Sequence, residues 1–254
     1  MKLFSIITIC RNNLRELIQT SETVISQSEQ DYEWIVVDGD STDGTKDWLN
    51  STPNQFKWIS EKDKGIYDAM NKGIGMAEGK YLIFLNSGDA FADQDVLKKI
   101  KNFLKTLKSD PAFLYGDSLD MNEAGNIYYR KAKDHRFIRR GMITQHQAML
   151  FNREKIKNLF YHPEYKYTAD YALICDVIYN SNPNEIARVD FAICRFSMGG
   201  TNEIYRFKAL KEDYQIRRRF LKLSMMEAST LYILHYIHTV LKKISPSLRF
   251  IKHK

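Results

Sequence analysis

The sequence predicts an α/β fold with a mainly parallel sheet and helices on both faces. Two observations carry this prediction. Apolar runs alternate with segments of helical spacing four times within the first 110 of the 254 residues, a pattern typical of parallel strands joined by crossover helices. Several of these runs also stop abruptly in small polar and acidic residues, as in VVDGDSTDGT and FLNSGD. Such loops are typical of the sheet edge where open α/β folds bind ligands.

The expected elements of the first half follow in chain order. Continuous apolar residues predict strands at residues 3–10, 32–38, 56–60 and 80–85. Apolar residues at helical spacing predict helices at residues 14–25, 45–49, 66–76 and 93–107. Asp43 or Thr45 is expected to cap the second of these helices, and Gly79 lies near the end of the third. Residues 1–110 therefore form the first half of the domain.

The alternation breaks after Pro111. Short strands are expected at residues 113–117, 127–130, 148–152 and 186–196, with a helix around residues 171–179. The segment MNEAGN is typical of a hairpin turn. Residues 111–205 are thus expected to be a mixed half of the same domain.

Positive charge is concentrated in the C-terminal tail. Residues 206–254 contain 12 Lys/Arg and 3 Asp/Glu, so the first 205 residues carry a net charge of −2 within a total of +7. This distribution excludes a basic nucleic-acid groove along the main domain and predicts an acidic partner at the tail. One interpretation is a basic amphipathic helix on an anionic membrane surface, and the other is a terminal helix packed on the domain. Its apolar stretch, residues 231–241, is shorter than the roughly 20 residues that span a bilayer.

The cysteines and the N-terminus indicate a cytoplasmic protein. Cys10, Cys175 and Cys194 are scattered and odd in number, so a disulfide framework is not expected. The N-terminal MKLFSIITICRNN has no small-residue cleavage site and is interpreted as the first strand.

Three acidic positions are candidate ligand contacts. Asp38 follows a hydrophobic strand and either accepts hydrogen bonds from a base or ribose or stabilises its own turn. In EKDKGIYDAMNKGI, Asp68 and Lys72 lie on one face at a helix N-terminus, which suits phosphate or sugar groups, or form an ordinary ion pair. Asp89 ends a buried strand and is a candidate cation ligand, although Asn86 and Gly88 supply no second carboxylate.

These segments together resemble a known family. The ordered set SIITICRN, EWIVVDGDSTDGT, EKDKGIYDAMNKGI and YLIFLNSGD resembles the family-2 glycosyltransferases, inverting GT-A fold enzymes that use nucleotide-diphosphate sugars. The resemblance covers residues 3–200 and depends on the order and spacing of the four motifs. It is most similar to the bacterial branch that builds colanic-acid-type and other surface polysaccharides.

The resemblance implies a role for each matching residue. The positions implied to bind the nucleotide sugar are Thr8, Arg11, Asp38, Asp63, Lys64, Gly65, Asp68, Lys72 and Ser87. Asp89 matches the last acid of the family's DxD-like motif and is implied to bind a divalent cation, Mn²⁺ or Mg²⁺.

The second half is implied to supply the base and the acceptor side. Asp170, in YTADYALICDVI, matches the catalytic base, and its alternative role is a helix N-cap. His146 either contacts the acceptor or the diphosphate or is a satisfied, partly buried histidine. Gln147 and Arg195 are candidates for acceptor or diphosphate contacts, as is the FSMGG turn at residues 196–200.

The resemblance implies an inverting hexosyl- or N-acetylhexosaminyltransferase. Its donor is a nucleotide-diphosphate sugar, with a UDP-sugar favoured, and its acceptor is a glycan or a lipid-linked sugar. An anionic membrane surface is a further expected partner, which would make the protein peripheral on the inner face of the cytoplasmic membrane. The alternative function is a non-catalytic nucleotide-sugar-binding or assembly subunit, favoured by the single acid in NSGD. A nicotinamide-dependent oxidoreductase is excluded because CRNNLREL contains no glycine.

Overall fold

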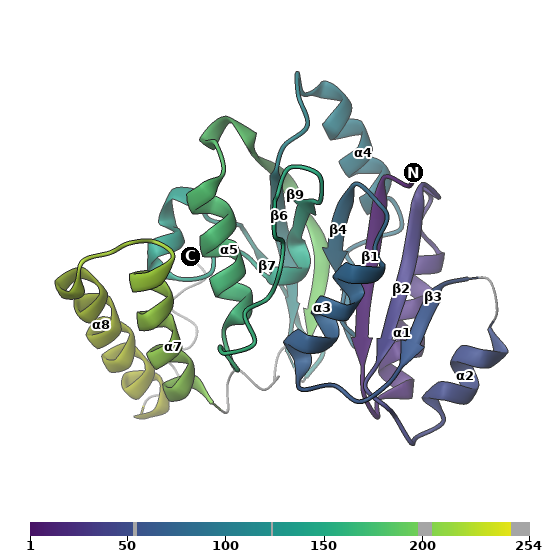
Figure 1. The fold of residues 1–254 in the computed structure, drawn as a ribbon, viewed down its shortest axis with the longest axis horizontal. Coiled ribbons are helices and arrows are strands. Elements are labelled where there is room, and N and C mark those ends of the chain that lie inside the picture. The colour runs from purple at the N-terminus through teal and green to yellow at the C-terminus, as the bar shows by residue number, and fades with distance from the viewer. Residues whose placement is uncertain (53–54, 123, 198–204, 245–254) are drawn as a thin grey trace.

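Within the described residues, a mixed sheet of nine strands forms the centre of the α/β part of the molecule, and α7 and α8 lie beyond it (Figure 1). The computed structural model describes residues 1–52, 55–122, 124–197 and 205–244. The strand order is β3-β2-β1-β4-β8-β6-β9-β5, and β7 pairs with β6. The strands are β1 (Phe4–Cys10), β2 (Tyr32–Asp38), β3 (Lys57–Ser60), β4 (Tyr81–Phe84), β5 (Ala90–Phe91), β6 (Phe113–Met121), β7 (Ile127–Arg130), β8 (Met149–Asn152) and β9 (Ile186–Ser197).

The first half of the sheet is parallel, as predicted. Strands β3, β2, β1 and β4 pair in parallel, and the register sets Cys10 beside Asp38 and Asp38 beside Ser60. The polar residues that follow these strands therefore meet at one edge of the sheet.

The second half is mixed, which also confirms the prediction. Strand β8 pairs antiparallel with β4 and β6, whereas β9 runs parallel to β6. The hairpin of β6 and β7 carries β6 to Met121, beyond the predicted end at residue 117. The two-residue strand β5, which pairs Ala90 with Arg195, was not predicted because two residues show no periodicity.

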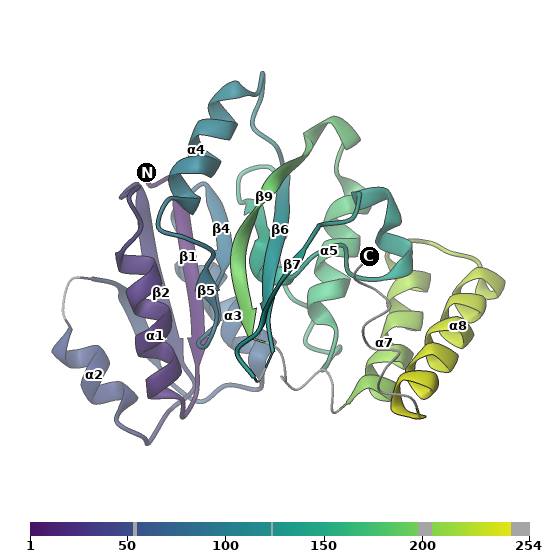
Figure 2. The same ribbon diagram turned by 180° about the vertical axis from the view of Figure 1, so that it is seen from behind.

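Helices cover both faces of the sheet (Figures 1 and 2). The helices are α1 (Leu14–Ile25), α2 (Thr45–Ser51), α3 (Ile66–Met76), α4 (Val96–Thr106), α5 (Ala169–Asn180), α7 (Arg206–Arg219) and α8 (Met225–Ile244). Ile6 of β1 packs in the core beneath α1 and α4, and its neighbour Ile7 packs in the core beneath α3 and α5. The continuous apolar sequence of β1 is thus explained by burial on both faces.

One carboxylate caps two helices. Asp43 Oδ2 accepts the backbone N–H of Leu14 (2.9 Å), and Asp43 Oδ1 accepts the N–H (3.2 Å) and hydroxyl (2.6 Å) of Thr45. Gly44 adopts φ +94° between them. Gly44 is the N-cap residue of α2, and the Asp43 carboxylate accepts the first N–H group of both helices, which anchors the loop after β2 to the start of α1.

The C-terminal tail forms two helices rather than one. Helix α7 packs against α5, and its Ile216, together with Phe220 beyond it, joins the core of that face. Helix α8 packs on α7 and is the outermost element at the end of the molecule away from β3 (Figure 1). None of the helices in the described part of the chain is long and apolar enough to cross a membrane.

Two glycines of α3 offer a matched test of this packing. A Cβ at Gly73 would collide with Ile7 Cγ2 of β1, whereas a Cβ at Gly75 would meet no atom within 4 Å. We expect Gly73→Ala to lower the free energy of unfolding by about 1 to 3 kcal/mol through overpacking. Gly75→Ala should raise it by roughly 0.5 to 1 kcal/mol because alanine is the better helix former. Equal effects of the two changes in urea unfolding would contradict the close packing of α3 on β1.

Candidate active site

Polar side chains converge where the parallel strands end. Asp38 is the last residue of β2, Asp63 follows β3, and Asp89 follows β4. All three carboxylates are largely buried. Since the carboxyl ends of these strands share one edge, the predicted donor-side residues belong to one region of the molecule.

The buried side chain of Asp38 stabilises the loop that follows β2. Its side chain has no exposed surface and accepts hydrogen bonds from the Ser41 N–H (3.1 Å), the Ser41 hydroxyl and the Ser60 hydroxyl (2.5 Å). Burial raises the pKa of the neighbouring Cys10 thiol, and the Asp38 charge raises it further. The carboxylate therefore stabilises its own turn.

The backbone that follows Asp38 is closely packed. A Cβ added to Gly39 would lie 2.6 Å from Asp63 Oδ2 and 3.2 Å from Arg11 Cδ. A side chain at this position would therefore displace its neighbours, and Arg11 is exposed. The structure thus brings together the predicted residues Arg11 and Asp63 on either side of the backbone that follows Asp38.

Lys72 joins the carboxylates after β3 to helix α3. Its Nζ lies 2.6 Å from Asp63 Oδ1, 2.9 Å from Glu61 Oε1 and 3.7 Å from Asp68 Oδ2. Desolvation lowers the pKa of Lys72, but the hydrogen bonds to Asp63 and Glu61 outweigh it and raise the pKa overall. The ion pair expected between Asp68 and Lys72 is the longest of the three contacts.

The N-terminus of α3 is exposed to solvent. Asp68 Oδ2 accepts the backbone N–H of Lys64 at 3.0 Å, which fixes the turn before the helix. Gly65 adopts φ +136°, and no atom lies within 4 Å of a Cβ placed there. Lys64 is exposed beside it. A ligand can therefore reach the backbone at this helix N-terminus.

Asp89 lies in a poorly solvated corner. Gln147 Nε2 donates to its Oδ2 at 2.6 Å, and the Ser197 N–H donates to its Oδ1 at 3.3 Å. Burial raises the pKa of Asp89 to about 7, against the lowering effect of these two bonds. Gln147, predicted to contact the acceptor or the diphosphate, is hydrogen-bonded to Asp89 in this structure. Arg195 lies on β9 and pairs with Ala90, the residue that follows Asp89 in the sequence.

This corner fits a cation held partly by its substrate. Among the described residues, no group of three or more His, Cys, Asp or Glu side chains could hold a metal ion. The buried side-chain oxygen of Asn86 has no hydrogen-bond partner in the described part of the chain, and an oxygen of this kind suits Mg²⁺ or Mn²⁺. Asp89 and Asn86 would therefore supply at most part of a coordination shell, with the remainder left to phosphate oxygens and water.

Asp170 lies at the first turn of α5 against the donor-side helix. The Tyr67 hydroxyl, from the first turn of α3, donates to Asp170 Oδ1 at 3.2 Å, and the Tyr171 N–H donates at 2.9 Å. Burial raises the pKa of Asp170, and these two bonds lower it in part. The carboxyl is thus held in place and made more basic than an exposed aspartate.

His146 lies behind this carboxyl in an aromatic layer. Its Nε2 and the Tyr161 hydroxyl are 2.7 Å apart, and Tyr161 stacks on Tyr67 with 5.5 Å between ring centroids. Burial lowers the pKa of His146 to about 3, so the ring is neutral at physiological pH. His146 is thus a buried histidine whose ring is paired with Tyr161.

Two other predicted residues are not brought into the open region. Thr8 has no exposed surface, and its hydroxyl donates to the Leu85 carbonyl (2.7 Å) and accepts from Trp34 Nε1 (2.9 Å). Ser87 is partly buried, and its hydroxyl lies 3.5 Å from the Asn13 carbonyl. The glycines of the FSMGG turn lie outside the described residues.

Glu212 of α7 is a site residue that the sequence did not reveal. Its Oε1 accepts the N–H of Lys166 (2.9 Å), and its Oε2 accepts the N–H groups of Tyr167 (2.9 Å) and Thr168 (3.0 Å) and the Thr168 hydroxyl (3.0 Å). These residues directly precede α5 and Asp170. A contact across 44 to 46 residues leaves no local pattern that could have predicted it.

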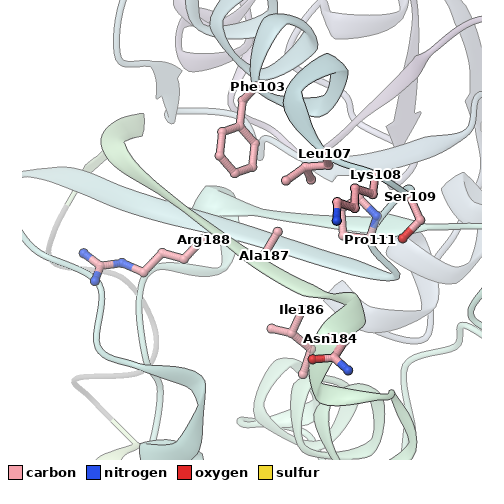
Figure 3. A pocket seen from close by; sticks show the side chains of 9 residues that line it. All are labelled: Phe103, Leu107, Lys108, Ser109, Pro111, Asn184, Ile186, Ala187 and Arg188. Carbon is pink, nitrogen blue, oxygen red and sulfur yellow. The ribbon is translucent and has the colours of Figure 1, made fainter.

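A separate cavity lies at the opposite edge of the sheet. Figure 3 shows this cavity of about 310 Å³, which is lined by side chains from the end of α4 and the start of β9, among them Phe103, Lys108 and Ile186. Because Ile186 pairs with Phe113, where β6 begins, this cavity lies far along the strands from Asp89 beside Ser197. It is not part of the candidate site.

The fold and these side chains define the class of protein. A parallel βα unit followed by a mixed half, with buried carboxylates at the shared strand edge, is the GT-A fold. S. aureus TarS (residues 1–349, in complex with UDP) has this fold, with a TM-score of 0.65 and 18% identity over 91% of this chain and 70% of that one. The mannosyltransferase PcManGT from Pyrobaculum calidifontis, in complex with GDP-Man and Mn²⁺, gives 0.66 and 13% over 96% and 75%.

Sequence comparison identifies the family. Residues 5–173 match the model of glycosyl transferase family 2, and the chain belongs to this family. A PGL/p-HBAD biosynthesis glycosyltransferase of Mycobacterium bovis is 35% identical over 120 residues, 45% of this chain and 46% of that protein. The putative teichuronic acid biosynthesis glycosyltransferase TuaG of Bacillus subtilis is 34% identical over 110 residues, 40% and 42% of the two chains. The chain thus matches about half the length of these curated relatives.

The environment of Asp89 predicts a pH-dependent stability. Its pKa of about 7 exceeds the ordinary 3.8, so the folded state favours the protonated carboxyl, and stability is lost as the pH rises between these values. We expect Asp89→Asn to raise the free energy of unfolding by roughly 1 to 3 kcal/mol at pH 8 and by clearly less at pH 5. Urea unfolding at both pH values measures this, with Asp190→Asn on the exposed surface as the control. A gain that is independent of pH would refute the raised pKa.

Proposed function

We propose that the protein transfers a sugar, with inversion at the anomeric carbon, from a nucleotide-diphosphate sugar to a hydroxyl of a glycan or lipid-linked acceptor in bacterial surface polysaccharide synthesis. Membership of glycosyl transferase family 2 and the similarity to TuaG support this proposal. Structural neighbours in complex with UDP, UDP-GlcNAc and GDP-Man support a nucleotide-diphosphate sugar as donor, and we propose a UDP-sugar that carries a hexose or N-acetylhexosamine.

The donor is assigned to the strand edge. The nucleotide would lie beside Arg11, Gly39 and Asp63, which are packed against one another, and the diphosphate would extend past Lys64 and Gly65 toward Asp89. Asp89 and the Asn86 side-chain oxygen would hold a divalent cation, Mn²⁺ or Mg²⁺. When bound, such an ion supplies positive charge that stabilises the departing diphosphate.

Asp170 is assigned as the base, and a single contact carries this assignment. The 3.2 Å hydrogen bond from Tyr67 joins Asp170 to the helix turn that also bears Asp68 of the donor side. Asp170 would take the proton of the acceptor hydroxyl as that oxygen bonds to the anomeric carbon, while the bond to the diphosphate breaks on the opposite face. A carboxyl whose pKa is raised by burial suits proton transfer near neutral pH.

The proposed location is the inner face of the cytoplasmic membrane. The excess of nine positive charges after residue 205 would bring the enzyme to anionic lipids and hence to a lipid-linked acceptor. A second candidate function is a non-catalytic nucleotide-sugar-binding subunit. It is favoured by the single carboxylate beside Asn86 and Gly88.

Asp170→Asn separates these functions. We expect the variant to lose roughly 10²- to 10⁴-fold in kcat because no base accepts the proton, while UDP binding with Mn²⁺ stays within about twofold of wild type. Transfer is measured across a panel of nucleotide sugars with and without Mn²⁺, and binding is measured by calorimetry. Asp176→Asn, on the same helix, is the control. Full turnover in Asp170→Asn would remove the base assignment, and UDP binding without any transfer by the wild type would favour the non-catalytic subunit.

A further inference from the structure

Helix α8 has its apolar face turned toward solvent. Met226, Ile233, Leu234, Ile237 and Leu241 are between 47% and 78% exposed. At 100° per residue these side chains, together with Thr230, fall within an arc of about 100°, the width of the stripe that normally faces a core. We call these six residues the α8 outer face.

The side of α8 that faces α7 combines small, polar and aromatic side chains. Ala228 and Thr239 are buried, and His235 Nδ1 lies 3.3 Å from a guanidinium nitrogen of Arg217. Arg217 is itself fully buried, and it donates to the Arg139 carbonyl at 2.9 Å. Two rings of α8 also contact rings of α7, with 6.4 Å between the centroids of Tyr232 and Tyr214 and 5.2 Å between those of Tyr236 and Phe207. These contacts hold α8 on α7 and leave the aliphatic side chains of the α8 outer face in solvent, which is the reverse of an ordinary surface helix.

Basic side chains also lie close to α8. The 3₁₀ helix at His135–Arg140 is near the inward side of α8, since a Cβ at Gly141 would be 3.9 Å from His235 Cε1. It exposes Phe137, Arg139 and Arg140, and the Arg140 guanidinium lies 5.2 Å from the centre of the Phe137 ring. An exposed apolar stripe with arginines and aromatic rings nearby is typical of a helix in a membrane interface.

We propose that the α8 outer face inserts into the headgroup region of an anionic lipid bilayer. Charge decides between this occupant and a second copy of the chain, because two tails that each carry an excess of nine positive charges repel each other. Anionic lipids attract the same charges and accept the apolar side chains. The inference rests on the proposed membrane location and assigns the surface responsible. It also implies that α7 stays with the catalytic domain while only α8 meets the lipid.

Vesicle binding tests this surface. Wild type is sedimented with vesicles of phosphatidylcholine alone or with about one-third phosphatidylglycerol, and we expect binding to the anionic vesicles that weakens with salt. Leu234→Ser with Ile237→Ser should lower the partition coefficient at least tenfold, because both changes remove apolar area from an exposed stripe. The control, Ile25→Ser with Ile127→Ser, removes similar exposed residues elsewhere and should bind as wild type does.

Several outcomes would overturn the proposal. These are wild type that stays free of anionic vesicles, a Leu234/Ile237 variant that binds normally, or a wild-type dimer that this variant dissociates. Transfer to a water-soluble acceptor is measured on the same preparations and should be unchanged in the variant. Lost binding with retained transfer supports the docking surface, whereas absent transfer in the wild type would count against the proposed function and not against the surface.

A second inference concerns Glu212. We infer that Glu212 is a positioning residue for Asp170, because its carboxylate gathers three backbone N–H groups and one hydroxyl from residues 166–168, immediately before α5. Asp170 follows two residues later, at the first turn of the helix. The charge of Glu212 also lies near enough to raise the pKa of Asp170. Helix α7 therefore fixes the position of the N-terminal end of α5, which carries the proposed base.

Glu212→Ala should reduce kcat at least tenfold and leave the affinity for UDP with Mn²⁺ within twofold. Glu212→Gln, which keeps one acceptor oxygen, should recover part of this loss, and Lys211→Ala on the exposed side of α7 is the control. Hydrogen exchange of amides 166–168 should accelerate in Glu212→Ala. Wild-type kcat in Glu212→Ala while Asp170→Asn is inactive would refute the positioning role alone, and a parallel loss of donor affinity and kcat would also refute it. An active Asp170→Asn would instead refute the base.

Discussion

Burial of the sheet on both faces is the constraint on which the rest of the structure depends. Strand β1 has Ile6 in one core and Ile7 in the other, so its backbone can meet solvent only at its ends. The same holds for β2 and β4, whose central residues are fully buried. Polar chemistry is therefore confined to the edge where these strands end, and the parallel register brings the loops that carry Asp38, Asp63 and Asp89 to that edge together.

The carboxylates at this edge differ in the number of hydrogen-bond donors around them. Asp38 has two hydroxyls and a backbone N–H, whereas Asp89 has only one amide and one long backbone contact. The smaller number of donors is why desolvation dominates at Asp89 and its pKa rises to about 7. The first carboxylate stabilises a loop, and the second is short of positive charge. A bound cation or a proton would balance the negative charge of the Asp89 carboxylate.

The sequence predicted what depends on local pattern and missed what depends on distant contacts. Strand β2 was predicted with its observed bounds, since a buried strand has continuous apolar residues. Glu212 was missed because its partners lie 44 to 46 residues away, and the bond from Gln147 to Asp89 was not predicted because it joins residues 58 positions apart. Asp38 illustrates an intermediate case. Its position at the strand end was predictable, but its complete burial depends on Ser60 from another strand.

The C-terminal helices α7 and α8 show the same contrast between local sequence pattern and distant contacts. Apolar spacing in α8 predicts an amphipathic helix, and an apolar stripe ordinarily faces the protein. The orientation is reversed because α7 already fills the core with Ile216 and presents a buried guanidinium, Arg217, to whatever packs over it. A guanidinium needs acceptors, so the polar side of α8 with His235 is the side that packs inward. Arg217 and the rings of α7 that contact Tyr232 and Tyr236 therefore fix which face of α8 meets solvent, and they lie on the helix that also carries Glu212.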